Sequence, residues 1–516
     1  MSLKDLKVLP GLFTLATDRG AVPRWKDGAW VRFWRGMPEK IGGYIKHSTS
    51  TFLGKARGTL AWKTLGLTKY IGFGTHLKLY VETGGTFYDI SPIRETQNPL
   101  GNNPFATTSA SAVVTVTDTA HGATTNDYVT FSGAAAVAGI TISGEYALTV
   151  VNDNSYTITH SAAANATTTG GGASVVGAYQ LNVGASYTVV GYGYGAGAWG
   201  DSTWGTARTV TSILDAARTW SLGAWGEDLI ACPRGGSIYV WDASVGTGTR
   251  ATLITNAPAT AKAIFVSEED RHLVALGAYD NVAAANDPML IRWCDSEDYT
   301  TWVAAVTNDA GRKRLDGGNE ILCRVAGRGE DLIFTDATLW AMAFEGPPYT
   351  YGFRPLGANG GIRGPNAAKE FNGRTFWMGK KDFFVHDGVV RVLPCDVLNH
   401  VMDDIDPSQG ALVFAGANRA FGEIWWLYPS DGATECDKFV LYNAYENTWS
   451  FGDLARTAYV GDSELFETPH AFGTDGYIYD HETGLNADAA AITSYLESGD
   501  VELGEGEQQM FISKLI

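Results

Sequence analysis

The side chains best suited to chemistry in this sequence are carboxylates that gather in two short runs. The runs are Glu268, Glu269 and Asp270 in one and Asp403, Asp404 and Asp406 in the other. Carboxylate oxygens are the ligands that a hard cation such as Ca²⁺ prefers. Neither run has the ligand spacing of a calcium loop, so we interpret both as solvated carboxylates of turns or strand edges.

Other catalytic patterns give weaker signals. Gly195, Gly197 and Gly200 fit G-x-G-x-x-G, but no helix follows them, and we interpret 191–200 as a structural glycine loop. The tripeptide at 461–463, Gly-Asp-Ser, resembles an esterase block but stands among strand-like residues. The nine histidines contain no i, i+4 pair. We therefore identify no catalytic residue, no cofactor and no metal ligand, and predict that the chain is not an enzyme.

Cysteine usage indicates the compartment in which the chain folds. None of the five cysteines lies within three residues of another, which excludes a C-x-x-C metal or redox unit. Each stands in or beside an apolar stretch, as expected for buried free thiols in a reducing cytoplasm. Residues 1–10 lack the apolar core of a signal peptide. The longest apolar run, 134–142, is too short to span a bilayer, so we expect no membrane anchor.

Composition predicts an all-β protein. Of 516 residues, 62 are Gly, 12% are aromatic and only 18% are charged. Frequent turns and aromatic-filled sheets give this profile. The net charge of −18 argues against a surface that grips phosphates. It suits either a passage through which nucleic acid slides without sticking or simple solubility.

A strand ending that recurs along the chain predicts the architecture. An apolar or aromatic pair followed by Asp or Asn occurs at 86–89, 237–242, 382–388, 440–443 and 476–480. The intervals between the last three endings are roughly 40–55 residues, close to the length of a four-stranded propeller blade, about 40–45 residues in the WD40 type. We predict a six- or seven-bladed β-propeller that occupies residues 59–100 and 186–516, with an inserted small β-sandwich.

The insertion is marked by a change in composition. Residues 101–185 are rich in Ala, Thr, Val, Ser and Gly and contain no Trp. Strand-like runs cover 112–117, 127–131, 145–151, 155–159 and 173–179, and Asn152-Asp153-Asn154 is a hairpin signal. We predict an Ig-like β-sandwich placed in a blade connection and decorating the outside.

Residues 1–58 are expected to form an N-terminal β arm for docking and assembly. Aromatic and basic residues interleave there, and the candidate contacts are Trp25, Trp30, Arg32, Trp34 and Arg35. Trp and Arg are enriched at interface hot spots. The same pattern also allows nucleic-acid binding, or long basic side chains lying over aromatic faces.

Two polar turns lead to Trp. They are Asp295-Ser296-Glu297-Asp298-Tyr299-Thr300-Thr301-Trp302 and Asn443-Ala444-Tyr445-Glu446-Asn447-Thr448-Trp449. The first is similar to the Asp-box turn of sialidases, although it is one residue short and lacks the Gly. The second is similar to a kelch blade ending. In both, the Asp or Asn side chain should bond turn amides and the Trp should pack between blades.

Several separated runs resemble tail proteins of short-tailed bacteriophages. They are 220–236, 291–298 with Trp302, 346–349 with 361–366, and 30–33 with 38–44. On these runs the chain resembles the tail nozzle, or packaged-DNA-stabilisation, proteins of podoviruses. The family is built from propellers, in accord with the repeat. The last residues, 511–516, look like a strand, which leaves open how the final blade closes.

The resemblance implies a structural virion protein. Such subunits form a homohexameric ring below portal and adaptor, extend the DNA channel, retain the packaged genome and conduct it at ejection. The implied partners are other copies of the chain, the tail adaptor or connector protein, and tail fibre or spike proteins. Genomic double-stranded DNA makes transient contact in the lumen. The expected location is the virion tail, after assembly in the host bacterial cytoplasm.

Two other functions remain open from the residues alone. The 16 Trp allow a receptor- or glycan-binding propeller on the virion tail, which would expose Trp on one face. A propeller glycosidase would place two carboxylates across its central channel. Nothing in the sequence selects such a pair.

Overall fold

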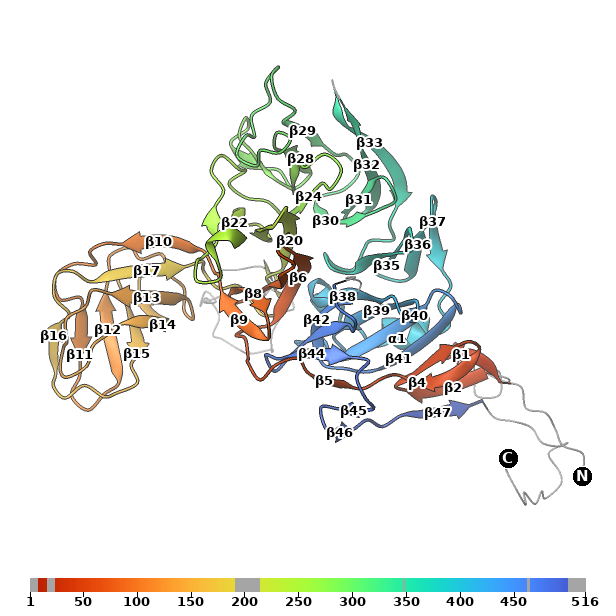
Figure 1. Ribbon diagram of the computed structural model, residues 1–516, viewed down its shortest axis with the longest axis horizontal. Coiled ribbons are helices and arrows are strands. Elements are labelled where there is room, and N and C mark those ends of the chain that lie inside the picture. Colours follow the sequence, from red (N-terminus) through yellow and green to blue (C-terminus); the bar gives the residue numbers. More distant parts are fainter. Residues whose placement is uncertain (1–7, 16–23, 191–213, 347–348, 462–464, 500–516) are drawn as a thin grey trace, which may run out of the picture.

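The computed structural model describes residues 8–15, 24–190, 214–346, 349–461 and 465–499 (Figure 1). The Gly-rich stretch 191–200, most of the tripeptide at 461–463 and the strand-like end 511–516 lie outside these residues. Within the described residues the chain is all-β, with six antiparallel sheets of four strands each and a seventh sheet of six strands around the ring. The predicted fold class, an all-β propeller with an inserted β-domain, is confirmed.

The first four sheets follow one another along the chain, apart from the insertion after β9. The first contains β6 (Ala56–Lys63), β7 (Lys69–Thr75), β8 (Leu79–Thr83) and β9 (Thr86–Asp89). The second contains β20 (Trp220–Trp225), β21 (Asp228–Pro233), β22 (Tyr239–Trp241) and β23 (Thr252–Leu253). The third contains β24 (Ala263–Val266), β25 (Leu273–Leu276), β28 (Leu290–Trp293) and β29 (Gly311–Arg314). The fourth contains β30 (Ile321–Ala326), β31 (Asp331–Thr335), β32 (Thr338–Gly346) and β33 (Thr350–Ala358).

The last three sheets complete the ring. The fifth contains β34 (Ala368–Phe371), β35 (Arg374–Met378), β36 (Phe383–His386) and β37 (Val390–Leu393). The sixth contains β38 (Phe414–Asn418), β39 (Glu423–Tyr428), β40 (Lys438–Asn443) and β41 (Thr448–Asp453). The seventh contains β42 (Arg456–Val460), β43 (His470–Gly473), β44 (Ile478–His481) and β5 (Tyr44–Lys46). The short strands β45 (Asn486–Ala487) and β46 (Ala490–Ala491) extend its edge.

The innermost strands form a closed ring. In order they are β6, β20, β24, β30, β34, β38 and β42, and each contacts the next, with β42 returning to β6. Figure 1 shows the sheets fanning outward around this centre. The recurrent strand ending is the third strand of its sheet in β22, β36, β40 and β44, and the outermost strand in β9. Because this motif lies on the third strand in four sheets, its spacing along the sequence indicated the blade repeat.

The last sheet is closed by a strand from the beginning of the chain. In β5, Tyr44, Ile45 and Lys46 pair antiparallel with His481, Asp480 and Tyr479 of β44. The described C-terminal residues do not supply this strand. Residues 44–46, which we had assigned to the N-terminal arm, therefore belong to the propeller, because the seventh sheet needs a fourth strand that its own segment lacks.

The inserted domain spans β10 (Ile93–Gln97) to β17 (Val176–Gln180). The strands between them are β11 (Phe105–Thr107), β12 (Val113–Thr117), β13 (Tyr128–Ser132), β14 (Gly144–Asn152), β15 (Ser155–Thr159) and β16 (Thr168–Gly170). The long strand β14 pairs with β13 on one side and β15 on the other, which links the two halves. Phe105, Phe131, Leu148 and Tyr179 are among the residues of a separate buried core. Figure 1 shows the domain beside the propeller.

A second β module, which we call the annex, lies on the other flank (Figure 1). It consists of β1 (Leu9–Leu12), β2 (Arg24–Ala29), β3 (Val31–Trp34), β4 (Met37–Lys40) and β47 (Tyr495–Ser498). In one sheet β2 pairs with both β1 and β47, and β3 pairs with β4 as a hairpin. Arg35 and Gly36 have φ of 54° and 73°, as a two-residue type I′ turn requires.

Helical and minor elements are short. The described residues contain the seven-residue helix α1 (Leu398–Asp404) and the 3₁₀ turns η1 (Ala243–Val245) and η2 (Pro407–Leu412). Two further hairpins pair β18 (Val189–Val190) with β19 (Leu214–Asp215) and β26 (Tyr279–Asp280) with β27 (Ala285–Asn286). No helix in the described part is long and apolar enough to cross a bilayer.

Candidate functional site

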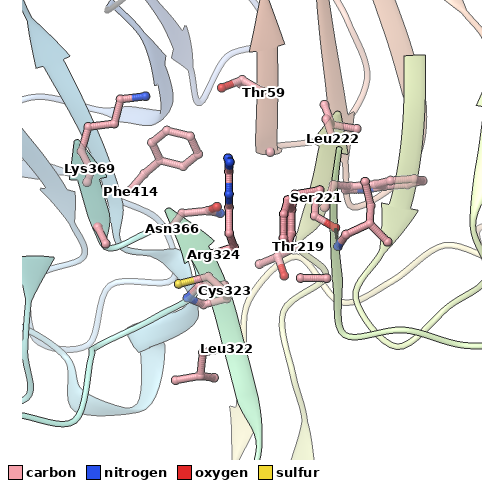
Figure 2. A pocket seen from close by; sticks show the side chains of 18 of the residues that line it. Thr59, Thr219, Ser221, Leu222, Leu322, Cys323, Arg324, Asn366, Lys369 and Phe414 are labelled. Atoms are coloured by element: carbon pink, nitrogen blue, oxygen red, sulfur yellow. Dashed lines mark hydrogen bonds between the residues drawn. The ribbon is translucent and has the colours of Figure 1, made fainter. Parts of the chain in front are cut away.

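The ring of inner strands surrounds a cavity of about 240 Å³. Every inner strand contributes to its wall, since the lining includes Thr59, Ser221, Phe265, Arg324, Lys369, Phe414 and Tyr459. Figure 2 shows side chains from several strands converging on this space. The volume lies just below the roughly 300–1,000 Å³ typical of small-molecule sites. The inner strands thus leave only a narrow space at the propeller axis.

The cavity wall carries positive charge. Lys262, Arg324 and Lys369 line it, and no Asp or Glu is among the described residues that do. Arg324 donates from Nε to Asp331 Oδ1 at 2.6 Å, and its guanidinium lies 4.7 Å from the Phe265 ring centre. Burial raises the pKa of Asp331, although Arg324 opposes that shift. Two of these charges are offset by carboxylates outside the lining, since Lys262 lies 3.6 Å from Glu320 and Arg324 pairs with Asp331.

This geometry removes the structural basis for a glycosidase at the propeller axis. Such an enzyme needs two carboxylates facing each other across the substrate. The described cavity lining contains no carboxylate. The carboxylate of Asp331 reaches the wall only through Arg324. The expectation that the chain is not an enzyme stays a prediction, because catalysis elsewhere is not addressed by this cavity.

The two carboxylate runs serve local structure. Asp406 caps η2 by accepting a hydrogen bond from the Ser408 amide at 2.8 Å. Asp270 accepts hydrogen bonds from the hydroxyls of Ser267 and Tyr351, whereas Glu268 and Glu269 are exposed. In the described part of the chain neither run brings three ligand atoms together. The interpretation as turn or strand-edge carboxylates fits Glu268, Glu269 and Asp270, which lie in a turn. It is wrong for Asp403 and Asp404, which end the helix α1.

The cysteines are inert by burial. All five are free and buried. Burial raises the thiol pKa of Cys232, Cys294, Cys323 and Cys436 to about 12. Since the thiolate is the reactive form, none of these four is a plausible nucleophile near neutral pH.

The candidate assembly contacts of the N-terminal segment divide into two groups. Trp30 and Arg32 are buried inside the chain, with 8% and 0% of their surface exposed, so neither side chain is free to reach a second subunit. Trp25 is half-buried against the propeller core. Trp34 is half-buried and Arg35 is exposed at the hairpin tip. Only the last two, and part of Trp25, remain available to a partner.

Arg32 is the centre of a buried ionic network that the sequence did not indicate. Its Nε lies 2.8 Å from Glu423 Oε1, and its guanidinium also pairs with Glu482. The guanidinium carbon lies 3.6 Å from the centre of the Phe421 ring. Burial opposes the charge of Arg32, but Glu423 and Glu482 together raise its pKa. The basic residues here lie over aromatic rings, as one of the sequence alternatives predicted.

The two Trp turns have the predicted construction. Asp298 Oδ1 accepts from the Thr300 amide at 2.8 Å, and Trp302 is buried. Asn443 Oδ1 accepts from the amides of Tyr445 and Glu446, both at 3.0 Å. Trp449 then reaches the neighbouring sheet, where its Nε1 donates to the Pro394 carbonyl at 2.9 Å. Both turns hold the fold together and carry no open ligand position.

Tryptophan does not form a binding face in the described structure. Of the 16 Trp in the sequence, 14 lie in the described residues, and each of those is buried or half-buried. The half-buried ones are Trp25, Trp34 and Trp340. The abundance of Trp thus reflects packing within and between sheets rather than an exposed surface for sugars.

Comparison with known proteins gives no family. No family model matches the chain, and no curated protein matches it. Among solved structures it is similar to a phage phi92 endosialidase, at 11% identity and a TM-score of 0.24, covering 93% of this chain and 68% of that one. It is also similar to YCF48 bound to a D1 peptide, at 11% identity and a TM-score of 0.33, covering 54% and 82%. These distant likenesses carry no conclusion about function, and the propeller is established by the chain's own sheets.

Proposed function

We propose that this chain is a structural protein of a bacteriophage tail, where copies of it form the nozzle ring that extends the DNA channel. In that role the ring lies below portal and adaptor, retains the packaged genome and conducts it at ejection. The observation that carries the proposal is the pair of β modules on opposite flanks of a closed propeller (Figure 1). A cyclic ring with head-to-tail contacts needs two different complementary surfaces on each subunit.

Both modules are fixed to the propeller by charged contacts. Lys78, which is almost fully buried, joins the propeller to Glu145 of the inserted domain. Arg250 reaches the same carboxylate at 3.4 Å. In the annex, Arg24 lies 2.7 Å from Asp396, which follows β37. Modules held in this way present their surfaces at a defined angle, which a closed ring requires.

The size of the central cavity bears on where DNA would pass. A cavity of about 240 Å³ cannot admit a double helix, whose major groove alone is roughly 12 Å wide. In this proposal the lumen lies between subunits and is lined by their outer surfaces. The net charge of −18 suits a wall along which a polyanion slides without being held.

The test is cryo-electron microscopy of the purified chain mixed with the connector complex of the phage that encodes it. We expect a closed ring on the connector axis, with the annex or the inserted domain at the subunit contacts. Mass photometry of the same mixture gives the copy number, for which six is expected. Monomers with no density at the connector would overturn the nozzle role. Binding of those monomers to host glycans would instead favour the receptor-binding alternative.

A further inference from the structure

The seam where the propeller ring closes contains a cluster of histidine and carboxylate groups. His47 follows β5, whereas His470 and Asp480 belong to β43 and β44 of the seventh sheet. His47 Nδ1 and His470 Nδ1 each lie 2.9 Å from Asp480 Oδ1. Glu82, from β8 of the first sheet, places Oε1 3.5 Å from His47 Nε2. We propose that this cluster is a binding site for a divalent transition-metal ion, with Zn²⁺ the best match.

Strand register brings these groups to one face. His470 and Asp480 are directly paired across β43 and β44. Asp480 is paired with Ile45 of β5, so His47, two residues further on, points to the same side. Diagonal neighbours of this kind are within reach of long and aromatic side chains. Glu82 then approaches from the adjacent sheet, which makes the site span three segments.

The separations between ligand atoms fit one ion. The ligand atoms of His47, His470 and Asp480 all lie within 4.8 Å of one another. In a tetrahedral zinc site with bonds of about 2.0–2.2 Å, neighbouring ligand atoms are separated by about 3.4 Å. The 2.9 Å separations of both Nδ1 atoms from Asp480 Oδ1 require shifts of about half an ångström, and the remaining separation, within 4.8 Å, requires a larger one. Two imidazoles and a carboxylate with water as the fourth ligand form a known zinc environment. Glu82 faces the other ring nitrogen of His47, Nε2, where it can accept a hydrogen bond and orient the ring.

His470 supplies an independent observation. Its side chain is 96% buried, with 4% of its surface exposed. Neither of its ring nitrogens makes a well-aligned hydrogen bond in the described structure, although Nδ1 lies close to Asp480 Oδ1. A buried imidazole normally has a partner for each nitrogen. The Nδ1 atom is thus positioned to bind an ion that the Asp480 carboxylate also binds.

The charges of the side chains in this cluster also favour a divalent cation. Asp480 and Glu82 bring two negative charges into a mostly buried seam, since Glu82 is only 3% exposed. A single protonated histidine leaves this set with a net negative charge. A divalent cation with two neutral imidazoles and two carboxylates makes it neutral, which lowers the cost of burial. Binding displaces imidazole protons, as metal binding to histidine generally does.

The ion would connect three parts of the fold that are distant in sequence. His47 and Asp480 are 433 positions apart, and Glu82 lies in another sheet. An ion bound by His47, His470 and Asp480 would cross-link the closing strand to the last sheet, and Glu82 would connect the His47 ring to the first sheet. The same cluster would therefore stabilise ring closure, independently of any role in a phage tail.

The experiment uses the full chain, stripped of metal by chelation, and titrated with Zn²⁺ by calorimetry. We expect one equivalent to bind per chain and the melting temperature to rise. Asp480→Asn and His470→Gln should each weaken zinc binding by at least about tenfold. Loss of a residue that only supports a metal ligand already costs about tenfold, so loss of a ligand should cost at least as much. His386→Gln is the matched control, because His386 is also a buried strand histidine but lies in the fifth sheet. That variant should bind Zn²⁺ as the unmodified chain does.

A second measurement keeps the proposal testable if a buried variant does not fold. X-ray absorption on the unmodified, zinc-loaded chain should show two imidazole nitrogens in a coordination sphere of four light atoms. His47→Gln is a milder change, because His47 retains 20% side-chain exposure, and it should remove one of those nitrogens. Undiminished zinc binding in both His470→Gln and His47→Gln, or a coordination sphere without imidazole, would overturn the assignment.

Discussion

The Arg32 Nε atom lies 2.8 Å from Glu423 Oε1, and the two side chains are 1% and 0% exposed. Arg32 comes from the annex and Glu423 from the sixth sheet, so this ion pair joins the two. Burial raises the pKa of Glu423 to about 7, although Arg32 opposes the shift. Removing one partner from such a pair leaves an uncompensated buried charge.

Arg32→Met should therefore destabilise the fold strongly, by about 3–5 kcal/mol. The double variant Arg32→Met with Glu423→Gln should lose less than the sum of the single variants, because it leaves no unpaired charge at the fully buried position 423. Urea unfolding followed by tryptophan fluorescence measures both. Arg35→Ala is the control. Its free energy of unfolding should stay within about 0.5 kcal/mol of that of the unmodified chain, because the Arg35 side chain is exposed. Strict additivity in the double variant would show that the pair is not coupled.

The closing seam should respond to pH. Hydrogen bonds to Asp480 and then to Glu82 raise the pKa of His47 to about 10. Burial opposes the charge of Asp480, but the hydrogen bond from His47 and the close approach of the His470 ring hold the pKa of that carboxyl below its usual range. The stability that His47 contributes to the fold is complete below its unfolded pKa of about 6.5 and is lost as pH rises toward 10. The Asp480 contribution is present above about pH 3.9 and is lost below it.

The measurement is the melting temperature of the unmodified chain minus that of His47→Gln, in the presence of a chelator, from pH 4 to pH 10. We expect the difference to be largest between about pH 4 and pH 6.5 and to shrink steadily at higher pH. Comparison with the variant cancels the titration of other histidines, several of which are buried. A difference that grows above pH 7 would contradict the assigned direction.

The inserted domain should be removable. Its first and last strands are adjacent, since Ile93 pairs with Gln180, so a short Gly-Ser linker can join residues 92 and 181. The domain contains no Trp, and Lys78 keeps Asp89 as a partner at 2.8 Å. We expect the tryptophan emission spectrum of the shortened chain to match that of the full chain. A red-shifted spectrum or loss of cooperative melting would contradict an independent insertion.

The cysteines should be unreactive in the folded chain. All five are buried, and burial also raises the pKa of the Cys395 thiol. A chromogenic disulfide reagent should label fewer than one thiol per chain in native buffer and all five in guanidinium chloride. One thiol that reacts within minutes under native conditions would show that a described cysteine becomes accessible.

If the nozzle proposal holds, the tip of the β3–β4 hairpin is a subunit contact. Trp34→Ala and Arg35→Ala should then reduce ring formation on the connector while leaving the monomer folded. Arg35 should affect only assembly, because its contact with Glu446 is made by the backbone amide. Leu65→Ala, in a 93% exposed position of the β6–β7 turn, is the control. Normal rings from both annex variants would remove this hairpin from the interface.

The sequence predicted those parts of the fold that depend on local pattern. The range 155–159 matches the observed strand β15 residue for residue, since alternation and flanking turns define it. The Asn443 turn was foreseen for the same reason. The spacing of the strand endings indicated blades because four of the five endings lie on the third strand of their sheets.

Features that depend on distant partners were not predicted. Arg32 was assigned to an interface, but Glu423 and Glu482 bury it, and no local signal connects residues so far apart. The histidine cluster was missed because its members lie on strands rather than on successive turns of a helix. The pair His470 and Asp480 at hairpin spacing was the one local sign of it.

The pairing of β5 with β44 also determines when the molecule can become a ring. During synthesis, β5 leaves the ribosome long before β44, with roughly 430 residues between them. At about 5–20 residues per second this delay lasts roughly 20–90 s. For that time an early strand stays without its partner while the intervening sheets fold, and its bare edge is open to pairing with another chain. Closure thus waits until nearly the whole chain has been synthesised, and any factor that shields the nascent N-terminal strand should raise the yield of correctly closed molecules.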